Sequence, residues 1–463
     1  MASPVACDGA PARAEALPSQ APVNRARRCW HPVCTAGSVF IIADAGLLKE
    51  TTSPSLRRRL PALCGFGLIT ALSSTALAAP CPTDLPNTIY GSGGSAITAT
   101  LGAVATVLAG LPLAERVTIF YWDPGACTGY QSFVDKDKGT ATLPVYFKYW
   151  DAAGTLTQCE AKGAEELSFA HMGNSPALCP AKQPLPAGFG RFTGPIQTIN
   201  IITHARSQYD SISAEAFYNV FGFGPGAAGH AVAPWTVPQA AFARPSSSFV
   251  HQFLAAAFKV PPTAFKVPAA NVLSTNQLSI QSVFQWGEST DVDQPLAYVS
   301  GSAADQGADA SQVKTLAVQY FDQACGYLPD SSRTRKDKLN VRKGQYALFT
   351  PGNFYTKTAA GGAIVSPAVN KLIRWFDGTL PAPAGLDIVK VIIQSGDIPL
   401  CAMQANRPDG DLNPIVSYAP ANPCNGYFEF TATGSTALKS CTGSNTCNTT
   451  AGEQCRFGFC ELY

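Results

Sequence analysis

Short hydrophobic runs alternate with helical periodicities along the chain. Runs rich in β-branched and aromatic residues predict strands, at residues 117–122, 145–150, 155–159, 167–172, 194–203, 240–243, 296–299 and 316–321. Apolar residues at helical spacing predict helices over residues 96–111, 214–221, 249–257 and 369–376. Gly378 ends the last of these. Because strands and helices alternate in this way, we expect an α/β fold.

The first 78 residues have the order of a leader. Arg57, Arg58 and Arg59 precede a mostly apolar stretch, residues 60–77, and small residues lead up to Ala78. This order predicts a secretory signal peptide, cleaved near Ala78, and hence a periplasmic or extracellular protein. The residues before Arg57 indicate that translation starts downstream of Met1. A genuine long leader and a membrane anchor are the alternatives.

The remainder of the chain has nearly balanced charge. The leader holds 8 of the 33 basic and 4 of the 31 acidic residues, which leaves 25 and 27 and a formal charge of −2. This balance argues against nucleic acid as a partner.

Eleven of the 15 cysteines follow Ala78. In a secreted chain they predict disulfides, with no metal and one thiol left free or paired between molecules. From about Cys401 the hydrophobic periodicity fades, and the last residues carry four cysteines, Cys441, Cys447, Cys455 and Cys460. That segment predicts a small disulfide-stapled appendage, with three pairings open.

Four loops carry small and hydroxyl-bearing residues beside predicted strands and helices. The first, Gly91 to Ser95, precedes a helix, where backbone N–H groups and the helix dipole favour an anion. The fourth combines Arg244 with a run of three serines, and a guanidinium offers the planar donors that oxyanions need. The others begin at Pro124 and Gly173. Each loop alone also suits an ordinary helix cap, but four in one chain favour binding.

The order of these loops resembles that of the phosphate-binding, type II periplasmic solute-binding proteins of ABC transporters. In that family G-S/A-G-x-T/S opens the first helix, a Gly-Ser-rich loop follows the next strand, a third loop ends in Ser-Asp, and a fourth reads R-x-x-S-G-T. The similarity covers residues 86–403, and the matching positions are residues 91–95, 124–128, 173–175, and Arg244 with residues 246–248. Residues 212–235 resemble the family's helix and F-x-G…W segment, and the cysteine-rich end resembles a secreted branch.

Three positions depart from the family pattern. Pro176 stands where the third loop has its aspartate, Ser247-Ser248 replaces Gly-Thr, and the second loop lacks its Gly-Ser-Gly core. In the family the aspartate accepts a proton from the ligand and helps reject fully deprotonated anions. The departure therefore argues against phosphate itself more than against anion binding.

The resemblance implies a two-lobed α/β protein of the type II periplasmic-binding-protein kind, with a small disulfide-rich C-terminal appendage. We expect a leader at residues 1–78, lobe I at 79–196 and 296–405, lobe II at 197–295, and a cysteine-rich tail at 406–463. The chain would cross between lobes near residues 194–203 and return near 296–300. The residues expected to bind the ligand are Ser92, Gly93, Ser95, Thr128, Ser175, Arg244, Ser246, Ser247 and Ser248.

The implied function is capture of a small inorganic or organic anion between the lobes, without catalysis or a cofactor. An ABC permease is the implied partner, and the protein is expected to be a monomer. A surface or adhesion protein on the same scaffold is one alternative. A secreted hydrolase is another, which would need a serine within reach of His171 or His204. We expect His171 to be a hydrogen-bonded structural residue and the basic segment 333–343 to be a solvated loop.

Overall fold

A computed structural model describes residues 79–137, 146–161, 165–181, 184–306, 312–408, 412–443 and 446–462. The predicted signal peptide, its cleavage position and the alternative start lie outside these residues. In the part that is described, no helix is long and apolar enough to cross a membrane.

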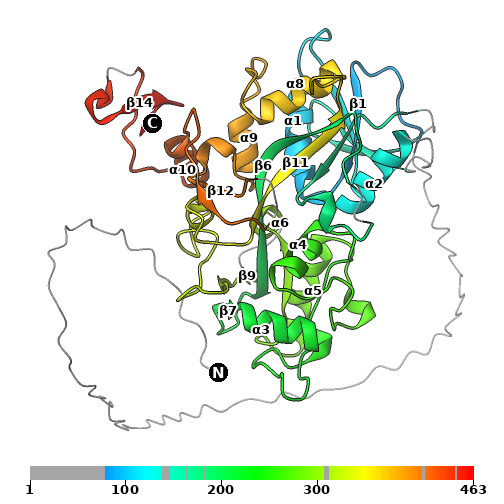
Figure 1. Cartoon of the computed structure of the whole chain (residues 1–463), viewed down its shortest axis with the longest axis vertical. Coiled ribbons are helices and arrows are strands. Elements are labelled where there is room, and N and C mark those ends of the chain that lie inside the picture. The colour runs from blue at the N-terminus through cyan, green and yellow to red at the C-terminus, as the bar shows by residue number, and fades with distance from the viewer. Residues whose placement is uncertain are drawn as a thin grey trace, which may run out of the picture. The chain divides into compact units, whose positions relative to one another are not determined.

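The largest sheet has nine strands, in the order β4-β3-β2-β1-β5-β11-β6-β8, with β9 also paired to β6. Of these, β1, β6, β9 and β11 are labelled in Figure 1. Strands β2, β1 and β5 are parallel, and β11 runs antiparallel between β5 and β6. The bounds are β1 Thr88–Gly93, β2 Thr118–Trp122, β3 Tyr146–Trp150, β4 Leu156–Glu160, β5 Phe169–Met172, β6 Phe189–His204, β8 Ala297–Ser300, β9 Val313–Thr315 and β11 Phe349–Lys357. The predicted hairpin is confirmed by the pairing of β3 with β4.

Strand β6 links two parts of this sheet. Its first half pairs with β11, from Phe349↔Thr198 to Lys357↔Phe189. Its second half pairs with β8 and β9 instead. Because β8 lies on this second half, the chain does not return to the side of β5 until β11. The long apolar run of the sequence thus forms one continuous strand that joins both regions.

The helices alternate with these strands, which confirms the α/β prediction. Along the chain, α1 follows β1, α2 follows β2, and α4 and α5 come between β6 and β8. The bounds are α1 Thr98–Ala109, α2 Ala126–Asp137, α3 Ala214–Tyr218, α4 Phe249–Ala257, α5 Asn276–Ser289, α6 Gly301–Gln306, α7 Leu339–Arg342, α8 Pro367–Phe376, α9 Ile388–Gln394 and α10 Asn425–Thr433. Small two-stranded sheets pair β7 Ser211–Ser213 with β10 Ala317–Gln319, β12 Ala405–Asn406 with β13 Val416–Ser417, and β14 Glu453–Arg456 with β15 Phe459–Leu462.

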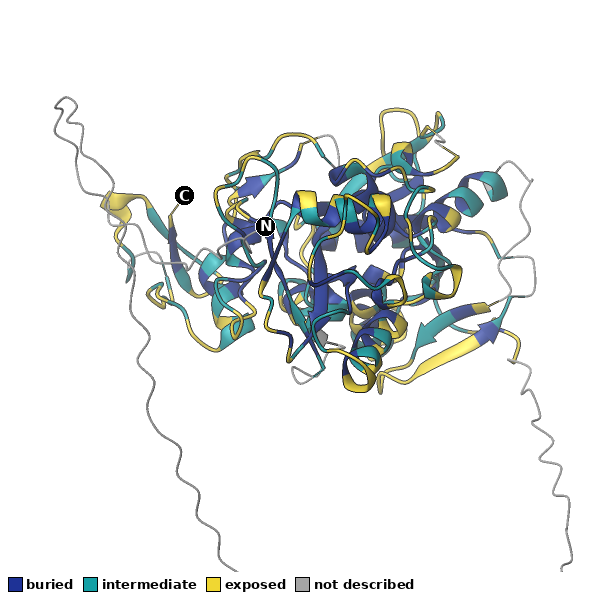
Figure 2. Cartoon of the chain, turned by 90° about the horizontal axis from the view of Figure 1, so that it is seen from below, coloured by how far each residue is buried: buried dark blue, intermediate teal, exposed yellow. Residues whose placement is uncertain are grey.

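Two predicted elements differ from the structure. The second polar loop is shorter than expected, because α2 begins at Ala126 and Thr128 lies in its first turn. Residues 240–243, where we expected a strand, do not form one. Pro238 begins a 3-10 helix, Pro238–Ala240, and only single β-bridges at Ala241 and Ala243 follow it. Figure 2 shows buried residues gathered along the strands and the inner faces of the helices.

Disulfides fix both ends of the described chain. The pairs are Cys81–Cys159, Cys127–Cys179, Cys401–Cys424, Cys441–Cys455 and Cys447–Cys460. Cys441–Cys455 and Cys447–Cys460 together are one of the three pairings that the sequence left open for the tail. The sulfur atoms of Cys441, Cys447 and Cys460 lie within 4.8 Å of one another, but all three are oxidised and are not metal ligands. Cys325 is disulfide-bonded too, so all eleven cysteines after Ala78 are oxidised and none of them is the free thiol expected from the odd count.

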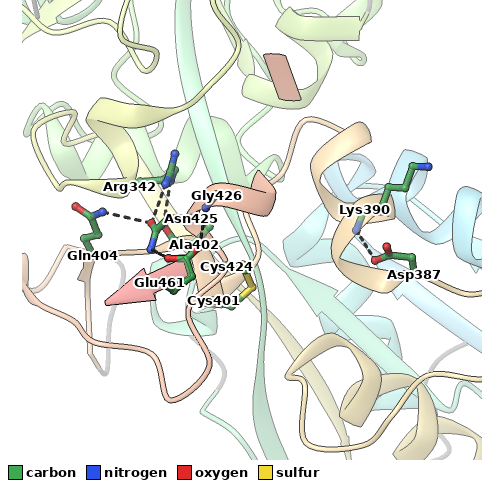
Figure 3. The surroundings of a disulfide bond; sticks show 10 residues. All are labelled: Arg342, Asp387, Lys390, Cys401, Ala402, Gln404, Cys424, Asn425, Gly426 and Glu461. Atoms are coloured by element: carbon green, nitrogen blue, oxygen red, sulfur yellow. Dashed lines mark hydrogen bonds between the residues drawn. A yellow bond between two sulfur atoms is a disulfide. The ribbon is translucent and has the colours of Figure 1, made fainter. Parts of the chain in front are cut away.

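The tail is joined to the body by a buried arginine as well as by Cys401–Cys424 (Figure 3). The Arg342 guanidinium is fully buried and donates to the Ala402 carbonyl at 3.0 Å and to Asn425 Oδ1 at 2.7 Å. Asn425 in turn donates to Glu461 at 3.1 Å. Helix α10 and strand β15 are therefore held to α7 by one chain of polar contacts.

The basic segment 333–343 is only in part the solvated loop we expected, because Arg333, Arg335, Lys336 and Lys343 are exposed whereas Lys338 and Arg342 are buried. Lys338 is 2 % exposed, and its ammonium group lies 2.6 Å from Asp305 and 3.1 Å from Asp330. The prediction was wrong for Lys338 and Arg342 because charge alternation along a sequence does not reveal partners that are distant in the chain.

Candidate functional site

A cavity of about 170 Å³ lies where four helices begin. Its lining includes Gly94 and Ser95 ahead of α1, Ala126 at the start of α2, Phe249 at the start of α4 and Asn276 at the start of α5. The first four N–H groups of a helix have no partner within it, and the helix dipole places partial positive charge at that end. Four helix starts around one small cavity create a site that favours negative charge.

Arg244 supplies the formal positive charge. The residue is 5 % exposed and lines the cavity. One of its terminal nitrogens donates to the Leu273 carbonyl at 2.8 Å, and its Nε is buried without a partner. No carboxylate pairs with it among the residues that the structure describes. Burial lowers the pKa of Arg244 to about 10, so the side chain keeps its charge at neutral pH.

The backbone around Arg244 is held rigidly. Its amide donates to the Tyr298 hydroxyl at 3.2 Å, and the same hydroxyl lies 2.7 Å from His251 Nδ1 on α4. Ser248 is the N-cap residue of α4, yet its side chain makes no capping hydrogen bond. Its hydroxyl therefore remains available to the cavity instead of serving the helix.

An ion pair lies at the edge of the cavity. Asp123, at the end of β2, bonds to Lys148 on β3 at 2.7 Å and accepts from Thr98 at 3.0 Å. Both charged residues line the cavity. Since Lys148 and Asp123 offset each other, the uncompensated charge in the cavity is that of Arg244.

The second and fourth loops are in direct contact. The Ser247 carbonyl accepts a hydrogen bond of 3.3 Å from the Cys127 amide in the first turn of α2. A Cβ atom added to Gly125 would lie 3.1 Å from that carbonyl oxygen, and the φ of Gly125 is +111°. Glycine thus permits the close approach, and segments more than a hundred residues apart meet at the cavity.

The structure places the predicted ligand residues in three groups. Ser95, Arg244, Ser247 and Ser248 line the cavity. Thr128, Ser246 and again Ser247 line an adjoining hollow of about 260 Å³ beside Cys127–Cys179. Ser92, Gly93 and Ser175 line neither.

These last three residues have structural contacts. Ser92 donates to the Gly129 carbonyl at 2.8 Å, and Ser175 caps the 3-10 helix Pro176–Leu178 by accepting from Ala177 at 3.3 Å. A Cβ on Gly93 would lie 2.0 Å from the His171 carbonyl oxygen.

Sequence reasoning missed part of the lining. Lys148 was assigned only to a hairpin, and Asp123 only to a turn. The start of α5, with Ser274, Thr275 and Asn276, also lines the cavity, and Thr275 is its N-cap, accepting from Leu278 at 3.1 Å. The Ser-Thr-Asn sequence is a capping signal that could have located this helix start.

None of the described histidines is hydrogen-bonded to a serine. His171 is buried against Phe354, neither of its ring nitrogens has a hydrogen-bond partner in the described part, and burial lowers its pKa to about 3. It is not the hydrogen-bonded residue we expected. His204 instead lies 3.0 Å from Glu288 and accepts from the Arg206 amide. The serine contact required for the hydrolase alternative is not seen at either position.

Comparisons with known proteins find distant structural similarity only. No family model matches the chain, and no curated protein matches its sequence. An ABC-type phosphate transport receptor from Vibrio cholerae is 14 % identical, with a TM-score of 0.42 over 67 % of this chain and 99 % of that one. PstS from Borrelia burgdorferi is 12 % identical, with a TM-score of 0.35 over 68 % and 98 %. The reduced OxyR regulatory domain from Pseudomonas aeruginosa is 8 % identical, with a TM-score of 0.35 over 62 % and 96 %.

Proposed function

We propose that this protein is a solute-binding protein that captures a small oxyanion in the cavity at Arg244. The observation that carries the proposal is a buried guanidinium without a carboxylate partner, at a cavity lined by four helix starts. An unpaired buried charge is costly. A bound oxyanion would supply the missing counter-charge and accept hydrogen bonds from the serine hydroxyls beside it.

The two-lobed arrangement belongs to the same proposal. Strand β6 is the crossing segment, with β11 on its first half and β8 on its second. The cavity combines residues that precede β6, such as Ser95, with residues that follow it, such as Arg244. Binding in that position would draw the two parts together by a hinge motion. Secretion, a monomeric state and delivery of the anion to an ABC permease are the further parts of this proposal, and the sequence resemblance supports them.

Replacing Arg244 tests the proposed site. Arg244→Met keeps the apolar volume of the side chain and removes its charge. Calorimetric titration with inorganic phosphate and with sulfate should show at least a tenfold loss of affinity, about 1.4 kcal/mol. In the ligand-free protein the same substitution should raise the thermal midpoint, because a buried unpaired charge is removed.

The matched control is Arg206→Met. Arg206 pairs with Glu288 at the surface, and its side chain is 63 % exposed. This variant should bind like the unmodified protein. Equal anion affinities for Arg244→Met and Arg206→Met would refute the assignment of the cavity.

A further inference from the structure

A further cavity, of about 520 Å³, lies where helices α8 and α9 meet the cysteine-rich tail. Its lining includes the end of α8, residues of α9, and Arg456 and Phe457 of the hairpin that β14 and β15 form. The cavity at Arg244 is smaller, about 170 Å³, and shares no lining residue with it. A hollow of this size is typical of sites for organic ligands.

Arg456 brings a positive charge to this cavity. One of its terminal nitrogens donates to Gln454 Oε1 at 2.7 Å, and its Nε is buried without a partner. Among the described residues no carboxylate pairs with it. Asp377 also lines the cavity, but it already pairs with Arg374 at 3.0 Å. The uncompensated charge at the cavity is therefore that of Arg456.

Most of the other lining residues are apolar. Aromatic and aliphatic side chains come from both the body and the tail, and they include Trp375, Phe376, Ile392, Leu400 and Phe457. An inorganic anion would satisfy Arg456 but would leave these apolar walls in contact with water. A guanidinium presents paired N–H groups that match the two oxygens of a carboxylate. The lining therefore suits a carboxylate that carries an apolar group.

Phe457 occupies a turn position that rarely accepts a large side chain. Phe457 and Gly458 link β14 to β15, and their φ angles are both positive, 49° and 82°. Two-residue turns of this kind favour Asn-Gly or Asp-Gly, because bulky residues are strained at positive φ. The Phe457 side chain is 44 % exposed, so burial offsets little of that strain. Contact of the ring with a ligand in the cavity would account for phenylalanine at this position.

The ring of Phe457 is also held toward the body. It stacks on Tyr427 of α10, with ring centroids 5.8 Å apart. The Tyr427 hydroxyl donates to Asp387, the N-cap residue of α9. The tail side of the cavity is thus fixed relative to α9, which lines the opposite side.

We propose that this cavity is a second binding site, which takes a small carboxylate with an aromatic or aliphatic body. The carboxylate pairs with Arg456, and the apolar body lies against Trp375, Phe376 and Phe457. The site is independent of anion capture at Arg244. It gives the cysteine-rich tail a role in binding, because Arg456 and Phe457 both belong to the tail.

The test compares two compounds that share an apolar body. 3-Phenylpropionate carries the carboxylate, and 3-phenylpropanol is its uncharged counterpart. Both are titrated calorimetrically into the full chain and into Arg456→Met, Phe457→Asn and the surface control Arg206→Met. Phe457→Asn removes the ring but creates an Asn-Gly turn, so its thermal midpoint should not fall. Loss of binding in this variant is then distinct from loss of folding.

We expect the unmodified protein and Arg206→Met to bind 3-phenylpropionate roughly tenfold or more tightly than 3-phenylpropanol, because only the acid pairs with the guanidinium. Arg456→Met should bring the ratio of the two affinities close to one. Phe457→Asn should weaken the binding of both compounds.

Three results would overturn the second site: no binding of 3-phenylpropionate to the unmodified protein at millimolar concentration, equal affinities of the acid for Arg456→Met and Arg206→Met, or equal affinities of the acid and the alcohol for the unmodified protein. Loss of 3-phenylpropionate binding in Arg244→Met instead of Arg456→Met would also overturn it, because the compound would then occupy the cavity at Arg244.

Discussion

Arg244 and Asp397 are both buried ionisable side chains, but burial leaves Arg244 charged and Asp397 neutral at neutral pH. Burial lowers the pKa of Arg244 only to about 10, so it stays charged and needs a counter-ion. Burial raises the pKa of Asp397 to about 8, so it becomes neutral instead. Thr100 donates a hydrogen bond of 2.9 Å to this carboxyl. The first residue therefore indicates a binding function and the second a pH-dependent stability.

The pH dependence of Asp397 can be worked out from its pKa. Because the folded-state pKa lies above the ordinary value of 3.8, the folded protein holds more protons than the unfolded chain between about pH 4 and about pH 8. Ionisation of Asp397 therefore lowers the free energy of unfolding as the pH rises through that window. Each unit between the two pKa values corresponds to about 1.4 kcal/mol, so the total loss is on the order of several kcal/mol. Nearby Asp305 raises this pKa, whereas Thr100, Gln197 and Lys338 lower it.

Asp397→Asn keeps an acceptor for Thr100 and cannot ionise. The free energy of unfolding, measured by urea titration on both sides of the window, should fall less with rising pH in this variant than in the unmodified protein. Parallel pH profiles for the two proteins would show that Asp397 does not titrate in this range.

At the scale of elements, strands and amphipathic helices could be predicted, but the contacts of polar segments could not. The apolar periodicity at residues 369–376 and the apolar runs that form β2, β5 and β6 could be read from the sequence. Each pattern depends only on which residues of that segment are buried. The start of α2 was missed because Thr128 and its neighbours carry no helical apolar pattern. Lys338 was placed in solvent because Asp305 and Asp330 become its partners only through the fold.

The ion pairs of Lys338 give a prediction about the segment before α7. Lys338→Met would leave the buried carboxylate of Asp330 and the partly buried carboxylate of Asp305 without their cation, and removing one partner of a buried pair typically costs about 3–5 kcal/mol. Urea unfolding at neutral pH should show a loss of that order. The surface variant Arg206→Ala should lose only about 0–1 kcal/mol. Similar losses for both variants would contradict the buried pairing.

At the scale of the molecule, the site depends on segments that meet only in the folded chain. The four candidate loops were recognised in the sequence one by one, and residues from the first, second and fourth now line one cavity. The start of α5 and the Asp123–Lys148 pair were not foreseen, because their importance comes from neighbours that are distant in sequence. The tail was expected as an appendage, and Arg342 shows that it is joined to the body by buried polar contacts.

Anion binding at Arg244 is tested by locating a bound oxyanion in a crystal of the protein. Arsenate has the shape and charge of phosphate, and the anomalous scattering of arsenic marks its position without ambiguity. We predict an arsenic peak in the cavity, with arsenate oxygens within hydrogen-bond distance of the Arg244 guanidinium and of Ser247 or Ser248. An arsenic peak elsewhere, or crystals grown with arsenate whose cavity holds none, would contradict this prediction.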